Sequence, residues 1–86
     1  MNISVELTLS PLTDDFEDII IRFIKRLRAS GLKVLENPLS TQVYGDYDTV
    51  MSVLNIEIKE TFTLMEHGVL YMKLVTSDRH DYEPDF

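Results

Sequence analysis

The sequence predicts an α+β domain in which two helices cover one face of a four-stranded antiparallel sheet. Apolar residues alternate with polar ones over residues 2–9, the period of a strand with one buried face. From Phe16 to Leu27 they recur every three or four positions, the period of a helix packed on a core. With the later elements, the chain order becomes βαββαβ, which is the ferredoxin-like, or split βαβ, arrangement.

The first helix is predicted between Asp14 and Gly31. Thr13 or Asp14 can cap its first turn, and Glu17 stands three residues after Asp14, as in a capping box. Gly31 can adopt the left-handed conformation that ends a helix. A strand therefore passes almost directly into a helix that packs on the core.

Two short strands are predicted over residues 32–36 and 40–44. They are separated by Asn37-Pro38-Leu39, where proline disfavours a continuous ladder. We expect Gly45-Asp46 to break the second of these strands. Together the two strands form a hairpin after the first helix.

The second helix is predicted from a cap at Asp46 or Asp48 to about Glu66. Residues 54–64 also alternate in polarity, so a strand is the alternative there; a strand this long without a turn signal is uncommon. A last strand is predicted over residues 69–76. The apolar face of the helix is expected to comprise Val50, Leu54, Ile58, Phe62 and Met65.

The 86 residues are enough for one small domain, which we place at residues 1–78, followed by a polar tail at 79–86. A chain of this size gains stability by association. The absence of cysteine excludes disulfides and cysteine-ligated zinc. No apolar run is long enough to span a membrane and no signal peptide is evident, so we expect a cytoplasmic protein without membrane insertion.

The net charge of −7 argues against a nucleic-acid partner and weakly favours a cationic ligand. Asp14, Asp15 and Asp18 resemble a magnesium motif, but their place at a helix start is explained by capping and the helix dipole. Neither histidine has a second ligand at metal-binding spacing. We therefore expect no catalysis, no metal and no cofactor.

The sheet face turned away from the helices is the expected functional surface, and side-chain alternation assigns its residues. Such a surface can simply face water, or it can suit a flat, polar, nitrogen-containing heterocycle. The residues assigned to it are Glu6, Thr8 and Ser10, then Ser40, Gln42 and Tyr44, and finally Tyr71, Lys73 and Val75. On the last strand, Leu70, Met72 and Leu74 are expected to join the core instead.

Several segments resemble the YkoF-related proteins that bind thiamine and hydroxymethylpyrimidine. They are Leu9-Ser10-Pro11-Leu12-Thr13-Asp14-Asp15-Phe16, Leu39-Ser40-Thr41, Gly45 and Asp48-Thr49-Val50. The resemblance covers nearly the whole chain as one repeat, and extends to small single-domain thiamine-binding proteins that form dimers or tetramers. The closing Ser77-Asp78-Arg79-His80 departs from the family, because it lacks a glycine-containing ending.

The resemblance implies a non-catalytic binder of thiamine or its pyrimidine moiety, a homodimer or homotetramer, serving vitamin uptake or salvage. The expected ligand-binding residues are Glu6, Thr8, Ser10, Ser40, Thr41, Tyr44 and Tyr71, with Thr13, Asp14 and Asp15 next. The last three can instead be only a helix cap, since we expect the end of the first strand and the start of the third at opposite ends of the sheet. The rival hypotheses are a ligand-free module that associates through the open sheet face, and a regulatory domain for another metabolite.

Overall fold

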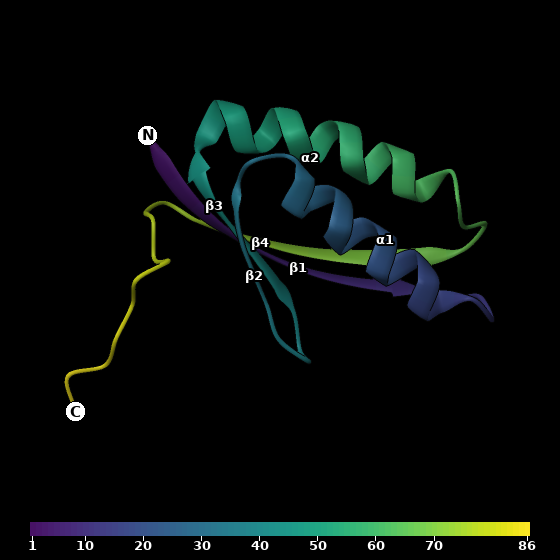
Figure 1. The fold of residues 1–86 in the computed structure, drawn as a ribbon, viewed down its shortest axis with the longest axis horizontal. Coiled ribbons are helices and arrows are strands. Elements are labelled where there is room, and N and C mark those ends of the chain that lie inside the picture. Colours follow the sequence, from purple (N-terminus) through teal and green to yellow (C-terminus); the bar gives the residue numbers. More distant parts are fainter.

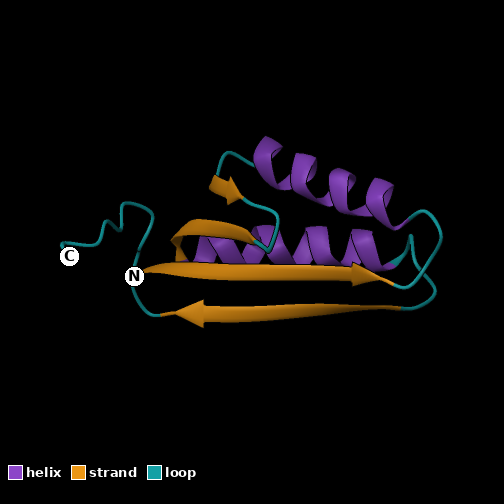
Figure 2. Ribbon diagram, turned by 90° about the horizontal axis from the view of Figure 1, so that it is seen from below, coloured by secondary structure: helices purple, strands orange, loops and turns teal.

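The computed structural model describes residues 1–86 and has the predicted βαββαβ order (Figure 1). The sheet order is β2-β3-β1-β4 with every neighbouring pair antiparallel, and both helices lie on one face (Figure 2). The ferredoxin-like α+β fold is thus confirmed. The elements are β1 (Asn2–Pro11), α1 (Phe16–Ala29), β2 (Lys33–Glu36), β3 (Thr41–Asp46), α2 (Tyr47–Phe62) and β4 (Gly68–Val75).

The core lies between the sheet and the two helices. The alternating apolar residues of β1, which were predicted to be buried, contribute to it from the sheet side, and apolar residues of both helices contribute from the helix side. This arrangement removes one whole face of the sheet from water and leaves the other face free. The core residues are Ile3, Val5, Leu7, Phe23, Leu27, Val43, Val50 and Leu54.

The start of α1 differs from the prediction. The helix begins at Phe16, its N-cap residue is Asp15, and no side chain caps it. The Thr13 hydroxyl donates a hydrogen bond to Asp15 Oδ1 (2.7 Å) instead of to the helix backbone, so the predicted capping box is wrong. The helix end is as predicted, because Gly31 has a φ of 88° just beyond it.

The third strand does not break at Gly45-Asp46. Both residues pair with β1, opposite Ile3 and Asn2, so β3 continues through them. Asp46 is then the N-cap of α2, where its carboxylate accepts a hydrogen bond from the Thr49 N–H (3.4 Å). The strand passes into the helix without a loop.

The second helix is confirmed over the alternative strand, but it ends at Phe62 rather than near Glu66. Its buried residues are Val50, Leu54, Glu57 and Thr61, so the core face is turned toward α1 relative to the prediction. Glu57 is 8% exposed and forms a two-point ion pair with Arg26 of α1, with Oε1 3.0 Å from Nη2. The ion pair with Arg26 explains why the charged Glu57 can lie on the buried side of α2.

Strand β4 lies at an edge of the sheet and is only partly covered by the helices, since Leu70 packs against the core. α1 packs on β1 and β2, and α2 packs on β3. Met72 and Leu74 were predicted to join the core, yet each is 42% exposed. That prediction is wrong for these two residues because the helices cover this edge strand incompletely.

Candidate functional site

The open face of the sheet carries the polar residues that alternation assigned to it. Glu6 of β1 lies between Gln42 of β3 and Lys73 of β4, at the centre of the sheet. Thr8 lies beside Tyr71, and Ser10 beside Val69. The antiparallel register therefore arranges the predicted residues in successive rows across the strands.

The Glu6 carboxylate is held by a small polar network. Ser40 Oγ donates to Glu6 Oε2 (3.0 Å), and Gln42 Nε2 donates to Ser40 Oγ (2.6 Å). Lys73 Nζ lies 3.5 Å from Glu6 Oε1. Glu6 is thus a positioned anion that remains partly open to solvent.

A cavity of about 210 Å³ lies beside this network, where β3 leaves β1. The β1–β3 pairing ends at Leu7 and Thr41, whereas β1 continues along β4 as far as Pro11. The loop of residues 37–40 diverges there, so the edge of β1 loses its strand neighbour and space opens beneath α1. The lining residues are Leu7, Thr8, Leu9, Ile20, Phe23, Ile24, Glu36, Asn37, Pro38, Leu39, Ser40 and Thr41.

The cavity brings together three of the predicted ligand residues. Thr8 and Ser40 line it from the open side. Thr41 does not face the open side, because it pairs with buried Leu7, is 7% exposed and therefore points toward the helix layer. The Ser40-Thr41 pair consequently presents hydroxyls both to the Glu6 network and to the cavity.

The expectation that the end of the first strand and the start of the third lie at opposite ends of the sheet is wrong. Because β1 and β3 are antiparallel, the start of β3 lies beside the later half of β1. Even so, Thr13, Asp14 and Asp15 do not line the cavity. Ser10 and Tyr71 also lie outside it, and Tyr71 is largely exposed.

Two polar residues of the cavity were not anticipated. Asn37 Oδ1 accepts hydrogen bonds from the backbone N–H groups of Leu39 (2.8 Å) and Ser40 (3.0 Å), which fixes the loop. Glu36 Oε2 lies 3.5 Å from Arg28 Nη2. The Asn-Pro pair was a signal for such a loop, since asparagine side chains commonly bond the backbone two residues on.

The chain after β4 returns to the open face. Ser4 Oγ donates to the Ser77 carbonyl (2.7 Å) and accepts from the Arg79 N–H (2.8 Å). The ring of His80 contacts the Tyr44 ring edge-on, with centroids 6.1 Å apart. Arg79 and His80, which we assigned to the tail, are thus attached to the sheet, while the last residues extend away from it (Figure 1).

Tyr44 lies near two carboxylates. Burial raises the pKa of its hydroxyl above the ordinary value, and the charges of Asp78 and Glu6 raise it further. The same proximity favours a cation at this end of the open face.

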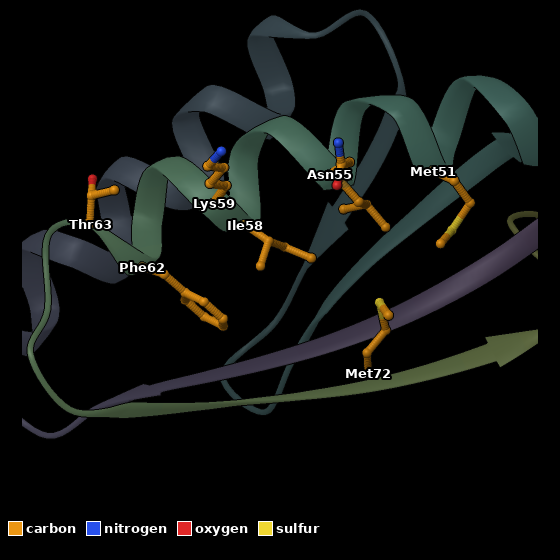
Figure 3. Close-up of a pocket in the computed structure, with 8 residues that line it drawn as sticks. Met51, Asn55, Ile58, Lys59, Phe62, Thr63 and Met72 are labelled. Carbon is orange, nitrogen blue, oxygen red and sulfur yellow. The ribbon is translucent and has the colours of Figure 1, made fainter.

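A second, more apolar groove of about 480 Å³ lies between α2 and β4. Ile58 and Phe62 point from the helix toward the sheet, and Met72 points back from β4 (Figure 3). None of the ligand residues predicted from the sequence lines this groove. It results from the incomplete helix coverage of β4.

The arrangement contains no group of three or more His, Asp or Glu side chains placed to hold a metal ion. Neither helix has the length and apolar character that crossing a membrane requires.

The fold and the cavity define a small ferredoxin-like domain whose sheet carries a recess lined by both hydroxyl-bearing and apolar side chains. Residues 5–85 match the model of the thiamine-binding protein family, so the chain belongs to that family. The resemblance noted from the motifs is thereby confirmed. No curated protein matches the sequence.

Solved structures share the fold at low identity. A candidate thiamine biosynthesis/salvage protein from Thermotoga maritima has a TM-score of 0.81 at 19% identity, covering 90% of this chain and 85% of that one. A protein from Streptococcus pneumoniae has a TM-score of 0.84 at 20% identity, covering 91% and 89%. A domain of unknown function from Bacillus cereus has a TM-score of 0.75 at 15% identity, covering 91% and 78%.

Proposed function

We propose that this protein is a non-catalytic binder of thiamine or its hydroxymethylpyrimidine moiety, serving vitamin uptake or salvage in the cytoplasm. The observation that carries the proposal is the cavity where β3 leaves β1. It gathers the Ser40-Thr41 pair and Thr8 in a chain that belongs to the thiamine-binding family.

The chemistry of the cavity matches a pyrimidine ring. Hydroxyls both donate and accept hydrogen bonds, as the ring nitrogens and the amino group of an aminopyrimidine require. The ring of Phe23 and the side chains of Ile20 and Ile24 supply apolar walls. In this proposal the pyrimidine enters the cavity and the positively charged thiazolium lies over the open face, near Glu6.

The first experiment is calorimetric titration with thiamine, with hydroxymethylpyrimidine and with an unrelated cationic heterocycle. Saturable binding of either of the first two, with the third silent, supports the proposal. If neither binds up to millimolar concentration, the proposal is wrong, and the ligand-free interaction module takes its place.

Thr41→Val tests the cavity itself. The substitution removes one hydroxyl at nearly constant volume, and we expect the affinity for the pyrimidine to fall by about tenfold, the loss of roughly one hydrogen bond. Thr61→Val is the matched control, because Thr61 is also buried but lies on α2 outside the cavity. Equal affinities of the two variants would place the ligand elsewhere.

We further propose that the protein works as a homodimer or homotetramer. The free edge of β4 and the exposed apolar side chains of Met72 and Leu74 support association between copies, which would bury surface that the monomer leaves in water. Sedimentation equilibrium checks this directly. A mass equal to that of the monomer at micromolar concentration would contradict it.

A further inference from the structure

The segment Ser77–His80 forms a strap across one end of the open face. Its backbone is attached at two points to Ser4, whose hydroxyl is 2.7 Å from the Ser77 carbonyl and 2.8 Å from the Arg79 nitrogen. Ser4 lies between Tyr44 and Val75, so the strap is fixed beside the Tyr44 ring. The strap therefore adds side chains to a surface that the sheet alone does not complete.

Asp78 is the carboxylate that the strap contributes. The backbone N–H of His80 donates to Asp78 Oδ1 (3.0 Å), and His80 Nδ1 lies 2.6 Å from the same oxygen. These contacts lower the pKa of Asp78, so the group is anionic at neutral pH. Its orientation is set within the strap itself.

Asp78 and Glu6 differ in whether a permanently charged cation lies beside the carboxylate. Glu6 is already close to Lys73, whereas Asp78 has no lysine or arginine partner and is paired only with His80. The Arg79 guanidinium is directed to Ser77 Oγ (2.9 Å from Nε) instead. No lysine or arginine therefore competes for the Asp78 carboxylate beside the aromatic ring.

We propose that Asp78, held by the strap beside Tyr44, is a specificity-determining residue that gives the open face a preference for a cationic heterocycle. The inference rests on the proposed function and deepens it. A ligand whose neutral ring occupies the cavity would place its positive ring near Glu6, and the charge of Asp78 acts on it from the far side of Tyr44, which lies near both carboxylates. Intact thiamine carries that charge, and the hydroxymethylpyrimidine fragment does not.

The physical basis is a carboxylate and an aromatic face acting on the same cation. Ion pairs at partly exposed positions contribute modestly, so the preference is a matter of a few-fold in affinity rather than of all-or-none binding. The effect is electrostatic and therefore declines as salt is added.

The test compares the wild type with Asp78→Asn by titration with thiamine and with hydroxymethylpyrimidine, at pH 8 and low salt. We expect the substitution to weaken thiamine by about threefold and to leave the uncharged fragment unchanged. Asp81→Asn is the matched control, since it removes the same charge from the next aspartate along the chain, which is exposed, and should alter the affinity for neither ligand. Asp78→Glu keeps the charge and should retain the preference for thiamine.

The outcomes separate the two proposals. If the wild type binds both ligands and Asp78→Asn matches Asp81→Asn, the role of Asp78 is wrong while the binding function stands. Equal weakening of both ligands by Asp78→Asn would show a structural role for the strap and would also overturn the inference. If the wild type binds neither ligand, the proposed function fails and the inference fails with it.

Discussion

Neighbouring residues in this chain face different surfaces, and this determines what each can do. Ser40 donates to Glu6 on the open side, whereas Thr41 is buried on the helix side. Both line the same cavity because the sheet opens at their position. A two-residue motif thus supplies hydroxyls from two directions to one small space.

At the same scale, burial decides which apolar side chains stabilise the fold. Leu54 and Ile56 both lie on α2, but Leu54 is 1% exposed and Ile56 is 61% exposed. We expect Leu54→Ala to lower the free energy of unfolding by about 2–5 kcal/mol, because it leaves a cavity in the core. Ile56→Ala is the control and should change it by less than about 1 kcal/mol. Urea denaturation measures both, and similar losses would contradict the assigned core.

At the scale of elements, one residue ends the first helix and another residue begins the second. Gly31 follows α1 with a φ of 88°, and a Cβ there would meet no atom within 4 Å. Asp46 ends β3 and caps α2. Glycine is therefore favoured at position 31 by its left-handed backbone conformation and not by a lack of space for a side chain.

Gly31→Ala should destabilise the protein by about 1 kcal/mol, because alanine is strained in the left-handed region. Gly31→Asn should cost less, since asparagine tolerates that conformation. Thermal or chemical unfolding of the two variants checks the order. An alanine variant as stable as the wild type would show that the turn relaxes to another conformation.

The cap at Asp46 makes part of the stability depend on pH. The hydrogen bond from the Thr49 N–H, with a smaller contribution from the terminal ammonium of Met1, lowers the pKa of the Asp46 carboxyl. A lowered pKa in the folded state gives stability that is present above the ordinary pKa of an aspartate and is lost as the pH falls through the folded value.

Asp46→Ala should therefore unfold at lower urea than the wild type at pH 7, with the difference diminishing toward pH 3. Asp46→Asn serves as the control, because asparagine also caps helices but does not titrate in this range. A difference that stays constant between pH 7 and pH 3 would contradict the role of the charge.

At the scale of the whole molecule, the two ends of the chain meet on the sheet. Ser4 forms hydrogen bonds with Ser77 and Arg79 of the strap, which are 73 and 75 residues away from it in the sequence. The helices cover three strands and leave β4 at a free edge. The open face and the α2–β4 groove result from how much of the sheet the two helices cover, and the cavity results from where β3 leaves β1.

Truncation separates the strap from the rest of the tail. A chain ending at His80 should keep the stability of the full chain, because residues 81–86 are exposed. A chain ending at Thr76 should lose about 1–2 kcal/mol of unfolding free energy, since two hydrogen bonds to the buried Ser4 disappear. Urea unfolding of both forms measures the difference, and equal stabilities would show that the strap contributes nothing.

The sequence by itself determined the type and order of the elements and which side chains of β1 are buried, because the periods of strands and helices are local properties. It also carried the motifs of the thiamine-binding family. Only the tertiary structure decided that Thr41 lines a cavity, that Met72 and Leu74 remain exposed, and that the strap reaches Tyr44. These features depend on where β3 leaves β1 and how far the helices extend over the sheet. They arise from contacts between distant segments, which no local pattern records.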